Sequence, residues 1–158
     1  MNGLNGHIER AKGSYCKLVL IAGPSGSGKT NLMRNISKSD DNPYLNLNLE
    51  LSRKLLDLPI DKRSLELPGC IEEILSAFPD DVIFLDNTEL LFAKEMDMGP
   101  LRMLQSLSRK KTIVASWNGL YDGKTLVYAE PGHPEYKLYK QNGIDAAIYS
   151  MSEERMIE

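Results

Sequence analysis

The fold of this chain is decided by the stretch Lys17-Leu-Val-Leu-Ile-Ala-Gly23-Pro-Ser-Gly-Ser-Gly28-Lys29-Thr30. After Lys17, residues 18–22 form a continuous apolar run rich in branched side chains, which is typical of a parallel strand covered on both faces. The next eight match the pattern G-x-x-x-x-G-K-[ST] at every fixed position. Helical spacing follows, with Leu32, Met33 and Ile36 on one face. We call Gly23–Thr30 the glycine loop and expect it to join a buried strand to a helix.

A loop of this composition at the start of a helix is suited to binding phosphate. Glycines let successive backbone N–H groups surround the anion, and the positive end of the helix dipole faces it. Lys29 is expected to face solvent and to reach the β- and γ-phosphates of ATP, and the Thr30 hydroxyl to bind Mg²⁺. The expected nucleotide-binding residues are Gly23, Pro24, Ser25, Gly26, Ser27, Gly28, Lys29, Thr30 and Asn31.

A second metal-binding position is predicted at Asp86. It directly follows the apolar run Val82-Ile-Phe-Leu85, which predicts another buried strand. A carboxylate at the carboxyl end of such a strand is placed to hold a magnesium-bound water. The sequence therefore predicts a magnesium site made by Thr30 and Asp86.

The remaining pattern alternates strands and helices up to about residue 120, which predicts an α/β fold with a mostly parallel sheet between two layers of helices. Pro59 and Pro68 are assigned to a loop between two helices. Beyond residue 120 the period of two returns and predicts a β-rich end, with a hairpin or two short strands on either side of a turn at Glu130–Pro134. The expected strands are 17–22, 44–49, 82–85, 112–115, 126–129, 136–139 and 145–151, and the expected helices are 28–37, 51–58, 70–78, 89–92 and 101–108.

Length and composition restrict the class of protein. The 158 residues predict one domain, with an N-terminal segment 1–16, a core 17–130 and a C-terminal hairpin and tail 131–158. A net charge of −3 argues against a protein that holds nucleic acid by bulk electrostatics. Cys16 and Cys70 have no zinc-site spacing, and the polar first residues contain no signal sequence. These features predict a cytoplasmic protein without a membrane span.

The order of these motifs resembles the additional-strand ATPases, including the AAA+ group. That resemblance implies a three-layer P-loop core in which the glycine loop is the Walker A motif and Asp86 belongs to Walker B. It also implies that the strand after Asp86 lies between the two Walker strands. A polar residue at the end of that strand, called sensor 1, positions the attacking water; Asn118 is the first choice and Ser116 the second. The alternative is a turn at Asn118-Gly119.

The chain departs from the AAA+ pattern at two points. Asn87 stands where that family has a catalytic glutamate, so Glu89 and Glu50 are the candidate bases, Glu50 at the end of the second strand. Each also has an ordinary explanation, because acidic residues are common in the first turn of helices. About 28 residues follow Glu130, too few for the AAA+ helical lid. We therefore expect slow or assembly-dependent hydrolysis.

Basic residues at positions 109–111 have two interpretations. Arg109 ends the helix before the sensor strand, so the AAA+ resemblance makes it a candidate arginine finger for a neighbouring subunit, with Arg102 second. Arg109, Lys110 and Lys111 also form a small cluster at which DNA contact is conceivable. The ordinary alternative is a positive charge that complements the helix dipole.

A more specific resemblance covers most of the chain. The sequence is similar to the BrxF-type small P-loop proteins of bacteriophage-exclusion (BREX) defence systems. The segments that carry it are Gly23–Thr30, Leu47–Arg53, Leu85–Thr88, Leu107–Arg109, Ala115–Gly119 and Tyr128–Tyr136. This resemblance implies a cytoplasmic accessory subunit that binds ATP and works beside a methyltransferase and a large ATPase in antiviral defence.

Two other functions remain open from the sequence. The Gly-Pro-Ser-Gly-Ser-Gly-Lys loop also looks like that of guanylate kinases, although the arginines do not cluster as the lid of a small-molecule kinase requires. Asn87 instead favours a scaffold that binds nucleotide without hydrolysing it. Phosphate transfer to added nucleoside monophosphates distinguishes the kinase, and turnover with partners present distinguishes the scaffold.

Overall fold

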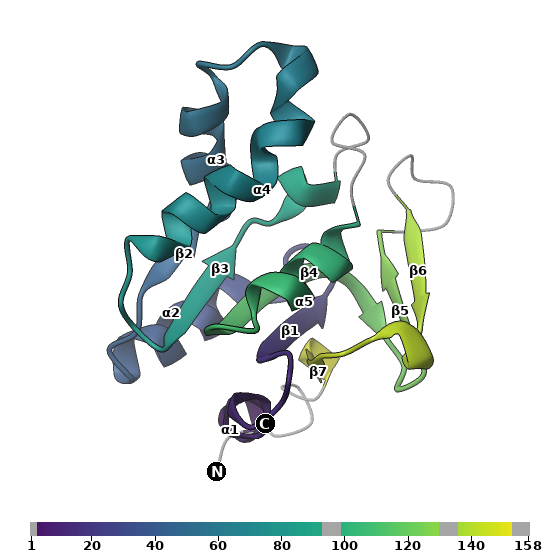
Figure 1. The fold of residues 1–158 in the computed structure, drawn as a ribbon. Helices are drawn as coiled ribbons and strands as arrows, with labels where there is room; N and C mark the ends of the chain where they lie inside the picture. Colours follow the sequence, from purple (N-terminus) through teal and green to yellow (C-terminus); the bar gives the residue numbers. More distant parts are fainter. Residues whose placement is uncertain (1–2, 93–98, 130–135, 153–158) are drawn as a thin grey trace.

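The apolar run before the glycine loop forms an inner strand of a seven-stranded sheet (Figure 1). A computed structural model describes residues 3–92, 99–129 and 136–152. The strands follow the order β2-β3-β4-β1-β7, all parallel to their neighbours, and β5 and β6 extend from β4 as an antiparallel pair. Their bounds are β1 Leu18–Gly23, β2 Tyr44–Asn46, β3 Val82–Asp86, β4 Thr112–Tyr121, β5 Thr125–Tyr128, β6 Lys137–Lys140 and β7 Ala147–Ser150.

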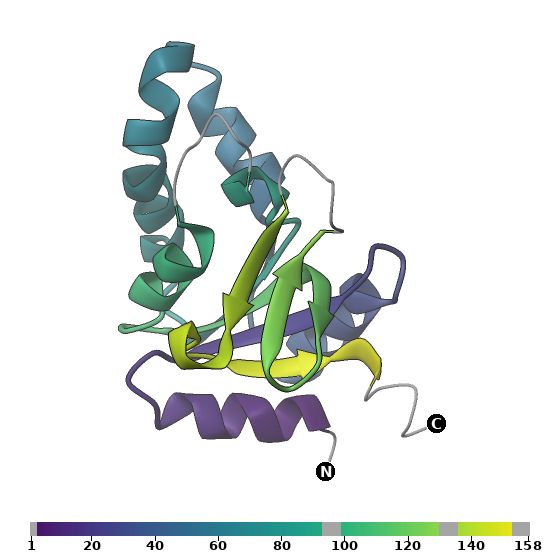
Figure 2. The ribbon, with the colours of Figure 1, turned by 90° about the vertical axis from the view of Figure 1, so that its right-hand side faces the viewer.

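Helices cover both faces of the sheet, which makes three layers (Figure 2). Side chains of β1 alternate between the two faces, with Leu18 and Leu20 in one core cluster and Val19 and Ile21 in the other. The Val19 side is covered by α1 (Gly3–Lys12) and α2 (Lys29–Ser39). The Leu18 side is covered by α3 (Leu47–Leu55), α4 (Ile60–Ser76), the 3₁₀ turn η1 (Glu89–Phe92) and α5 (Pro100–Leu107). None of the described helices combines the length and apolarity needed to cross a membrane.

The strand order brings most of the predicted site residues to one side of the sheet, where the carboxyl ends of β1, β3 and β4 lie. We call this side the carboxyl edge. β4 lies between β1 and β3, which is the order that the resemblance to the additional-strand ATPases implied. Gly23 pairs with Asn118 across β1 and β4, and Leu85, the residue before Asp86, pairs with Ala115 across β3 and β4. Because these strands are parallel, their carboxyl ends lie together. The start of α2 and the end of β3 therefore meet there.

The C-terminal part of the chain confirms the predicted hairpin and final strand. β5 and β6 pair antiparallel, and β7 pairs parallel with β1. Tyr149 of β7 is fully buried and contacts His7 of α1, so the two ends of the described chain share one core cluster. The predicted turn at Glu130–Pro134 and the tail from Glu153 lie outside the described residues.

The predicted strand 44–49 is wrong in its second half. β2 ends at Asn46, whose side-chain oxygen accepts a hydrogen bond from the Leu49 N–H (3.1 Å) and caps α3. Leu47 and Leu51 are fully buried and Leu55 nearly so, which is a helical spacing of four, whereas Leu49 is 47% exposed. Leucines and asparagines alternate across the start of α3. Because this alternation also fits the period of two of a strand, the sequence pattern does not show where the helix begins.

The loop predicted around Pro68 is also wrong. α4 begins at Ile60 and continues through Pro68 to Ser76. Leu67, Ile71 and Ile74 form a buried stripe on this helix. Proline lacks the N–H that would bond to the carbonyl four residues earlier. Burial of the apolar stripe against the sheet outweighs that loss.

Two further elements differ from the sequence prediction. α1 was not predicted, because its glycine and asparagine content hides the spacing of Leu4, Ile8 and Ala11, all buried. The alternative turn at Asn118-Gly119 is wrong, since β4 runs through both residues to Tyr121. A Cβ at Gly119 would lie 1.7 Å from the Val127 carbonyl oxygen, so only glycine lets β5 approach this closely.

We predict that Gly119→Ala lowers the free energy of unfolding by about 3 kcal/mol or more, because the added methyl group collides with backbone that is fixed on both sides. Gly69→Ala is the matched control. Gly69 lies inside α4, and a Cβ added there would have nothing within 4 Å, so alanine is expected to stabilise the helix by about 0.5–1 kcal/mol. Denaturant unfolding measures both variants, and equal effects would contradict the close approach of β5 to β4.

Candidate functional site

A cavity of about 300 Å³ lies at the carboxyl edge formed by β1, β3 and β4. We call it the site cavity. It collects residues of the glycine loop and the first turn of α2, the last residue of β3, residues that follow β3 and one residue of β4. Its lining consists of Ser25, Gly26, Gly28, Lys29, Thr30, Asn31, Asp86, Asn87, Glu89 and Asn118. The structure thus brings most of the predicted site residues together, although they come from three separate parts of the sequence.

The backbone of the glycine loop requires glycine at particular positions. Gly26 and Gly28 have φ values of 81° and 97°, in the left-handed region that other residues rarely adopt. At Gly23 a Cβ would lie 2.5 Å from the Ser27 Oγ and 2.8 Å from the Met151 side chain. The Ser27 Oγ is buried without a hydrogen-bond partner among the described residues. The loop is therefore closely packed against the segment after β7.

Lys29 is the first residue of α2 and is only 6% exposed. Its ammonium group donates to the carbonyl oxygens of Gly23 (2.7 Å) and Pro24 (2.8 Å), so the cation lies inside the loop. The prediction that Lys29 faces solvent is wrong. Burial lowers the pKa of Lys29, and the negative charges of Asp86 and Glu89 oppose this effect without cancelling it.

Asp86 ends β3 and is 3% exposed. Its Oδ2 accepts hydrogen bonds from the hydroxyls of Thr30 (2.6 Å) and Tyr44 (2.5 Å), and its Oδ1 accepts one from the Asn87 N–H (2.9 Å). Burial alone raises the pKa of Asp86, but these bonds and one from the Ser116 side chain outweigh it and hold the pKa below its usual value. The carboxylate is therefore ionised at neutral pH.

Glu89 begins η1 and is held by two asparagines. Its Oε1 accepts from the Asn118 side-chain amide (2.7 Å) and its Oε2 from that of Asn48 (3.0 Å). Asn48 also accepts from the Leu90 N–H (2.9 Å) through its side-chain oxygen. The predicted site residues did not include Asn48 or Tyr44. Asn48 belongs to the repeat Leu-Asn-Leu-Asn, and because this alternation also fits a strand, the repeat does not indicate that Asn48 lies on a helix near Glu89.

The turn after Asp86 explains why the acidic residue is displaced from position 87. Asn87 has a φ of 53°, a left-handed conformation that asparagine tolerates better than glutamate does. The chain then anchors itself through Thr88, whose hydroxyl donates to the Ser116 carbonyl oxygen (2.8 Å). This turn directs the side chain of Glu89 back into the site cavity.

Glu50 is not brought to the site cavity. It was expected at the end of a strand, but it lies in the first turn of α3 and pairs with Arg53 one turn later (3.6 Å). The structure therefore gives Glu50 the ordinary position of an acidic residue near a helix N-terminus.

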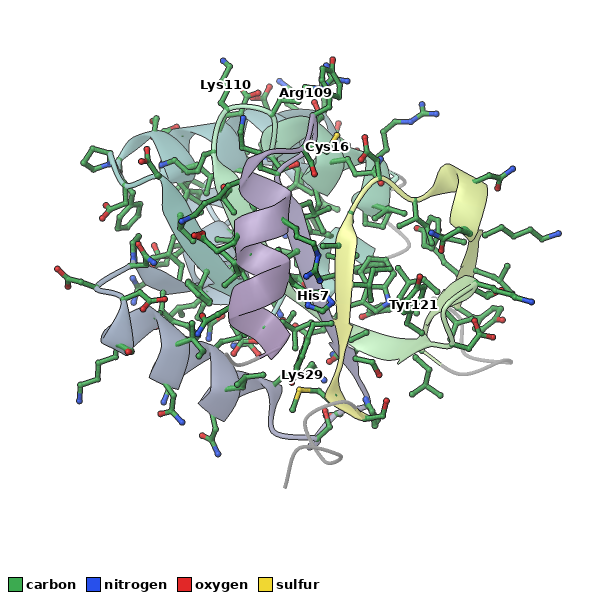
Figure 3. All side chains as sticks on the ribbon, turned by 90° about the horizontal axis from the view of Figure 1, so that it is seen from below. His7, Cys16, Lys29, Arg109, Lys110 and Tyr121 are labelled. Carbon is green, nitrogen blue, oxygen red and sulfur yellow. The ribbon has the colours of Figure 1, made fainter. Side chains whose placement is uncertain are left out.

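Arg109 lies at the opposite edge of the sheet from the site cavity. It precedes β4, and the strand from Thr112 to Asn118 spans roughly 20 Å. Figure 3 shows Arg109 and Lys110 at one end of the molecule and Lys29 at the other. The Arg109 guanidinium lies over the Tyr15 ring, 4.9 Å from its centre. Arg109 therefore does not serve the site of its own chain, and a role in a neighbouring subunit stays a prediction.

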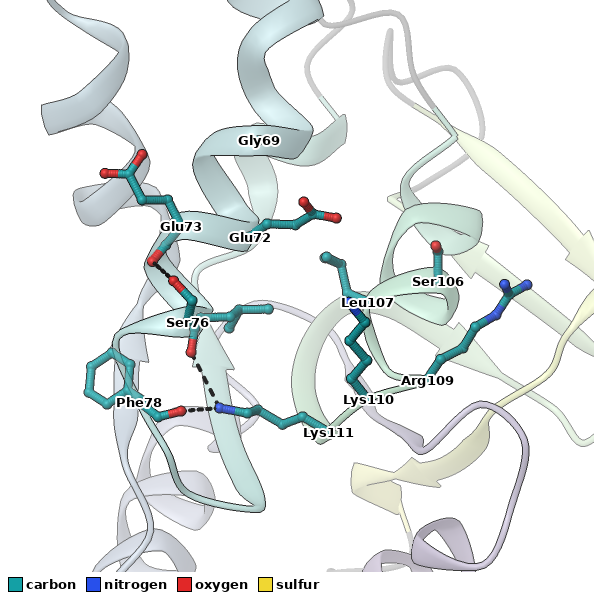
Figure 4. Close-up of a pocket in the computed structure, with 11 residues that line it drawn as sticks. Gly69, Glu72, Glu73, Ser76, Phe78, Ser106, Leu107, Arg109, Lys110 and Lys111 are labelled. Atoms are coloured by element: carbon teal, nitrogen blue, oxygen red, sulfur yellow. Dashed lines mark hydrogen bonds between the residues drawn. The ribbon is translucent and has the colours of Figure 1, made fainter.

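A second cavity, of about 650 Å³, lies between α4 and the end of α5 (Figure 4). Two of its charged side chains, Lys111 and Glu73, are engaged locally. Lys111 donates to the carbonyl oxygens of Leu75 (3.3 Å) and Phe78 at the end of α4, and Glu73 pairs with Lys54 (2.7 Å). The contacts of Lys111 satisfy carbonyl groups at the end of α4, and Glu72, Arg109 and Lys110 line other parts of the cavity.

Comparison of the sequence with protein-family models finds no match, and a search of curated proteins finds none either.

We predict that Asp86→Asn lowers the free energy of unfolding by about 2 kcal/mol at pH 7, because the variant loses the charge that accepts these hydrogen bonds. A carboxyl group with a lowered pKa in the folded protein stabilises it above the ordinary value of 3.8 and loses that effect as the pH falls through the folded value. The difference in the free energy of unfolding between wild type and variant is therefore expected to shrink below about pH 4. Denaturant unfolding at a series of pH values from 7 to 3 measures this difference. A difference that stays constant would show that the charge of Asp86 does not stabilise the fold.

Proposed function

We propose that this chain is an ATP-binding P-loop protein with an AAA+-like core and that it hydrolyses ATP slowly or only when assembled. The observation that carries the proposal is the hydrogen bond between Thr30 and Asp86, residues 56 positions apart in the chain (2.6 Å). It joins the hydroxyl and the carboxylate that magnesium sites in P-loop proteins require. Both groups line the site cavity together with Lys29 and other residues of the glycine loop.

The residues around the site cavity fit a magnesium–nucleotide complex. The left-handed glycines leave the loop open for close approach of a phosphate, and the ammonium of Lys29 is already inside the loop. Phosphate oxygens would replace the Gly23 and Pro24 carbonyls as its partners. Thr30 and Asp86 would hold the metal, directly and through a bound water. The metal supplies charge neutralisation at the β- and γ-phosphates, and α2 adds the positive end of its dipole.

Glu89 is the residue we propose as the base that orients the attacking water. It lines the same cavity as Lys29 and Thr30, and Asn118 holds one of its oxygens at 2.7 Å. Asn118 would then act as sensor 1 through this carboxylate. Each oxygen of Glu89 accepts one hydrogen bond from an asparagine, which orients the carboxylate and leaves lone-pair positions for a water.

The biological role that we propose is that of an accessory subunit in BREX antiviral defence, acting in the cytoplasm beside a large ATPase and a methyltransferase or through self-association. Its support is the sequence resemblance. Within the distinctive Trp117-Asn118-Gly119 segment, the Trp117 indole donates to the Val127 carbonyl oxygen (2.9 Å), which fixes the strand that carries Asn118. For the kinase alternative, no arginine is found among the described residues that line the site cavity.

We predict that Lys29→Ala weakens ATP binding by about 10- to 100-fold, because the variant removes the cation that faces the phosphates. Lys38→Ala is the matched control, since Lys38 is an exposed lysine in the last turn of the same helix. Isothermal titration calorimetry measures both affinities, and circular dichroism checks that each variant is folded. Equal affinities for Lys29→Ala and wild type would refute the P-loop assignment.

We predict that Glu89→Gln reduces ATP turnover by about 100-fold or more while changing ATP affinity less than threefold, because the amide keeps the size of the side chain but is a poor base. Glu66→Gln, at an exposed position of α4, is the control. Phosphate release is measured on the protein alone and with its assembly partners. Turnover that Glu89→Gln leaves intact would exclude this base, and no turnover by wild type under either condition would favour the scaffold.

A further inference from the structure

Tyr44 makes a contact with the proposed metal site that no motif in the sequence indicates. It is the first residue of β2, which is an outermost strand of the sheet. Its hydroxyl donates to the Asp86 Oδ2 at 2.5 Å. The same oxygen accepts the hydroxyl of Thr30 at 2.6 Å. One carboxylate oxygen therefore accepts two short hydrogen bonds, one from α2 and one from the edge strand.

The Oδ2 of Asp86 has little remaining capacity to accept another hydrogen bond. An ionised carboxylate offers about four lone-pair positions, about two on each oxygen. Thr30 and Tyr44 occupy those of Oδ2, and the Asn87 N–H bonds to Oδ1. A magnesium-bound water that donates to Oδ2, the oxygen that already bonds to Thr30, therefore has to displace one of its two donors.

Tyr44 is the donor that is easiest to displace. Thr30 can keep its bond to Asp86 while its oxygen binds the metal. Tyr44 instead lies on a three-residue edge strand, half-buried, with the guanidinium of Arg34 over its ring at 5.2 Å. Burial and the bond to Asp86 raise the pKa of Tyr44, so its hydroxyl remains a donor at neutral pH.

We propose that Tyr44 controls metal loading, because its hydroxyl and a magnesium-bound water compete for the Asp86 Oδ2. This inference rests on the proposed function, since it assumes that Thr30 and Asp86 hold a magnesium ion together with a nucleotide. Tyr44 acts through Asp86 and is a positioning residue. Its hydroxyl neutralises part of the carboxylate charge before the metal arrives, and it raises the Mg²⁺ concentration that nucleotide binding requires.

The test is Tyr44→Phe, which removes the hydroxyl and keeps the ring under Arg34. ATP affinity is measured by calorimetry at buffered concentrations of free Mg²⁺ and in excess EDTA. We expect the Mg²⁺ concentration that gives half of the gain in affinity to fall about three- to tenfold in the variant, with the affinity in EDTA unchanged. Tyr15→Phe is the matched control, because Tyr15 is 70% exposed at the opposite edge of the sheet, and it is expected to behave as wild type.

A second measurement follows the phenol itself. Addition of Mg²⁺ to the nucleotide-bound protein is expected to change the near-ultraviolet tyrosine absorbance of wild type and Tyr15→Phe, and to produce no such change in Tyr44→Phe. Thermal melting shows whether the variants are folded.

The outcomes separate this inference from the function on which it rests. If wild type binds ATP with magnesium and Tyr44→Phe needs as much Mg²⁺ or more, the competition is refuted and the P-loop assignment stands. A change of equal size in EDTA would place Tyr44 in nucleotide binding or folding and would also refute it. If wild type binds no nucleotide under any condition, both proposals fail.

Discussion

The carboxylate of Asp86 is the group on which the arrangement of the site depends. It is 3% exposed, and a charge in that position destabilises the fold unless hydrogen bonds compensate it. Thr30 brings a donor from α2, Tyr44 brings one from β2, and the backbone of Asn87 supplies a third. The same interactions that make the buried charge tolerable therefore fix the glycine loop, the edge strand and the turn after β3 relative to one another.

The turn after β3 determines where the second carboxylate of the site cavity lies. The left-handed turn at Asn87 leaves the position next to Asp86 without a carboxylate, and Glu89 returns one to the cavity after the chain has anchored at Thr88. Asn48 and Asn118 hold it from α3 and β4. The cavity thus contains two carboxylates with different surroundings. Asp86 bonds to hydroxyls and is suited to a metal, while Glu89 bonds to amides and is suited to a water.

The two edges of the sheet have different chemical character. The carboxyl edge carries the glycine loop, both carboxylates and Asn118. The opposite edge carries Arg109, Lys110 and Lys111, of which Lys111 is engaged with carbonyl groups at the end of α4. These three cations, which could otherwise assist phosphate chemistry, therefore lie far from the cavity of their own chain. In the proposed function this separation favours completion of the site by another subunit.

The sequence alone determined the inner strands, the helix after the glycine loop and the α/β class. These features follow from local patterns, namely continuous apolar runs and a fixed motif. Thr30 and Asp86 were each identified from such patterns, and the order of the parallel strands brings them into contact. The tertiary structure decided the start of α3 at Leu47, the passage of α4 through Pro68, the burial of Lys29 and the contacts of Tyr44 and Asn48. Each of these depends on a partner outside the local pattern, such as the sheet that buries a leucine stripe or the carboxylate that accepts a hydroxyl. A local pattern carries no information about such a partner, because only the folded chain brings it into contact.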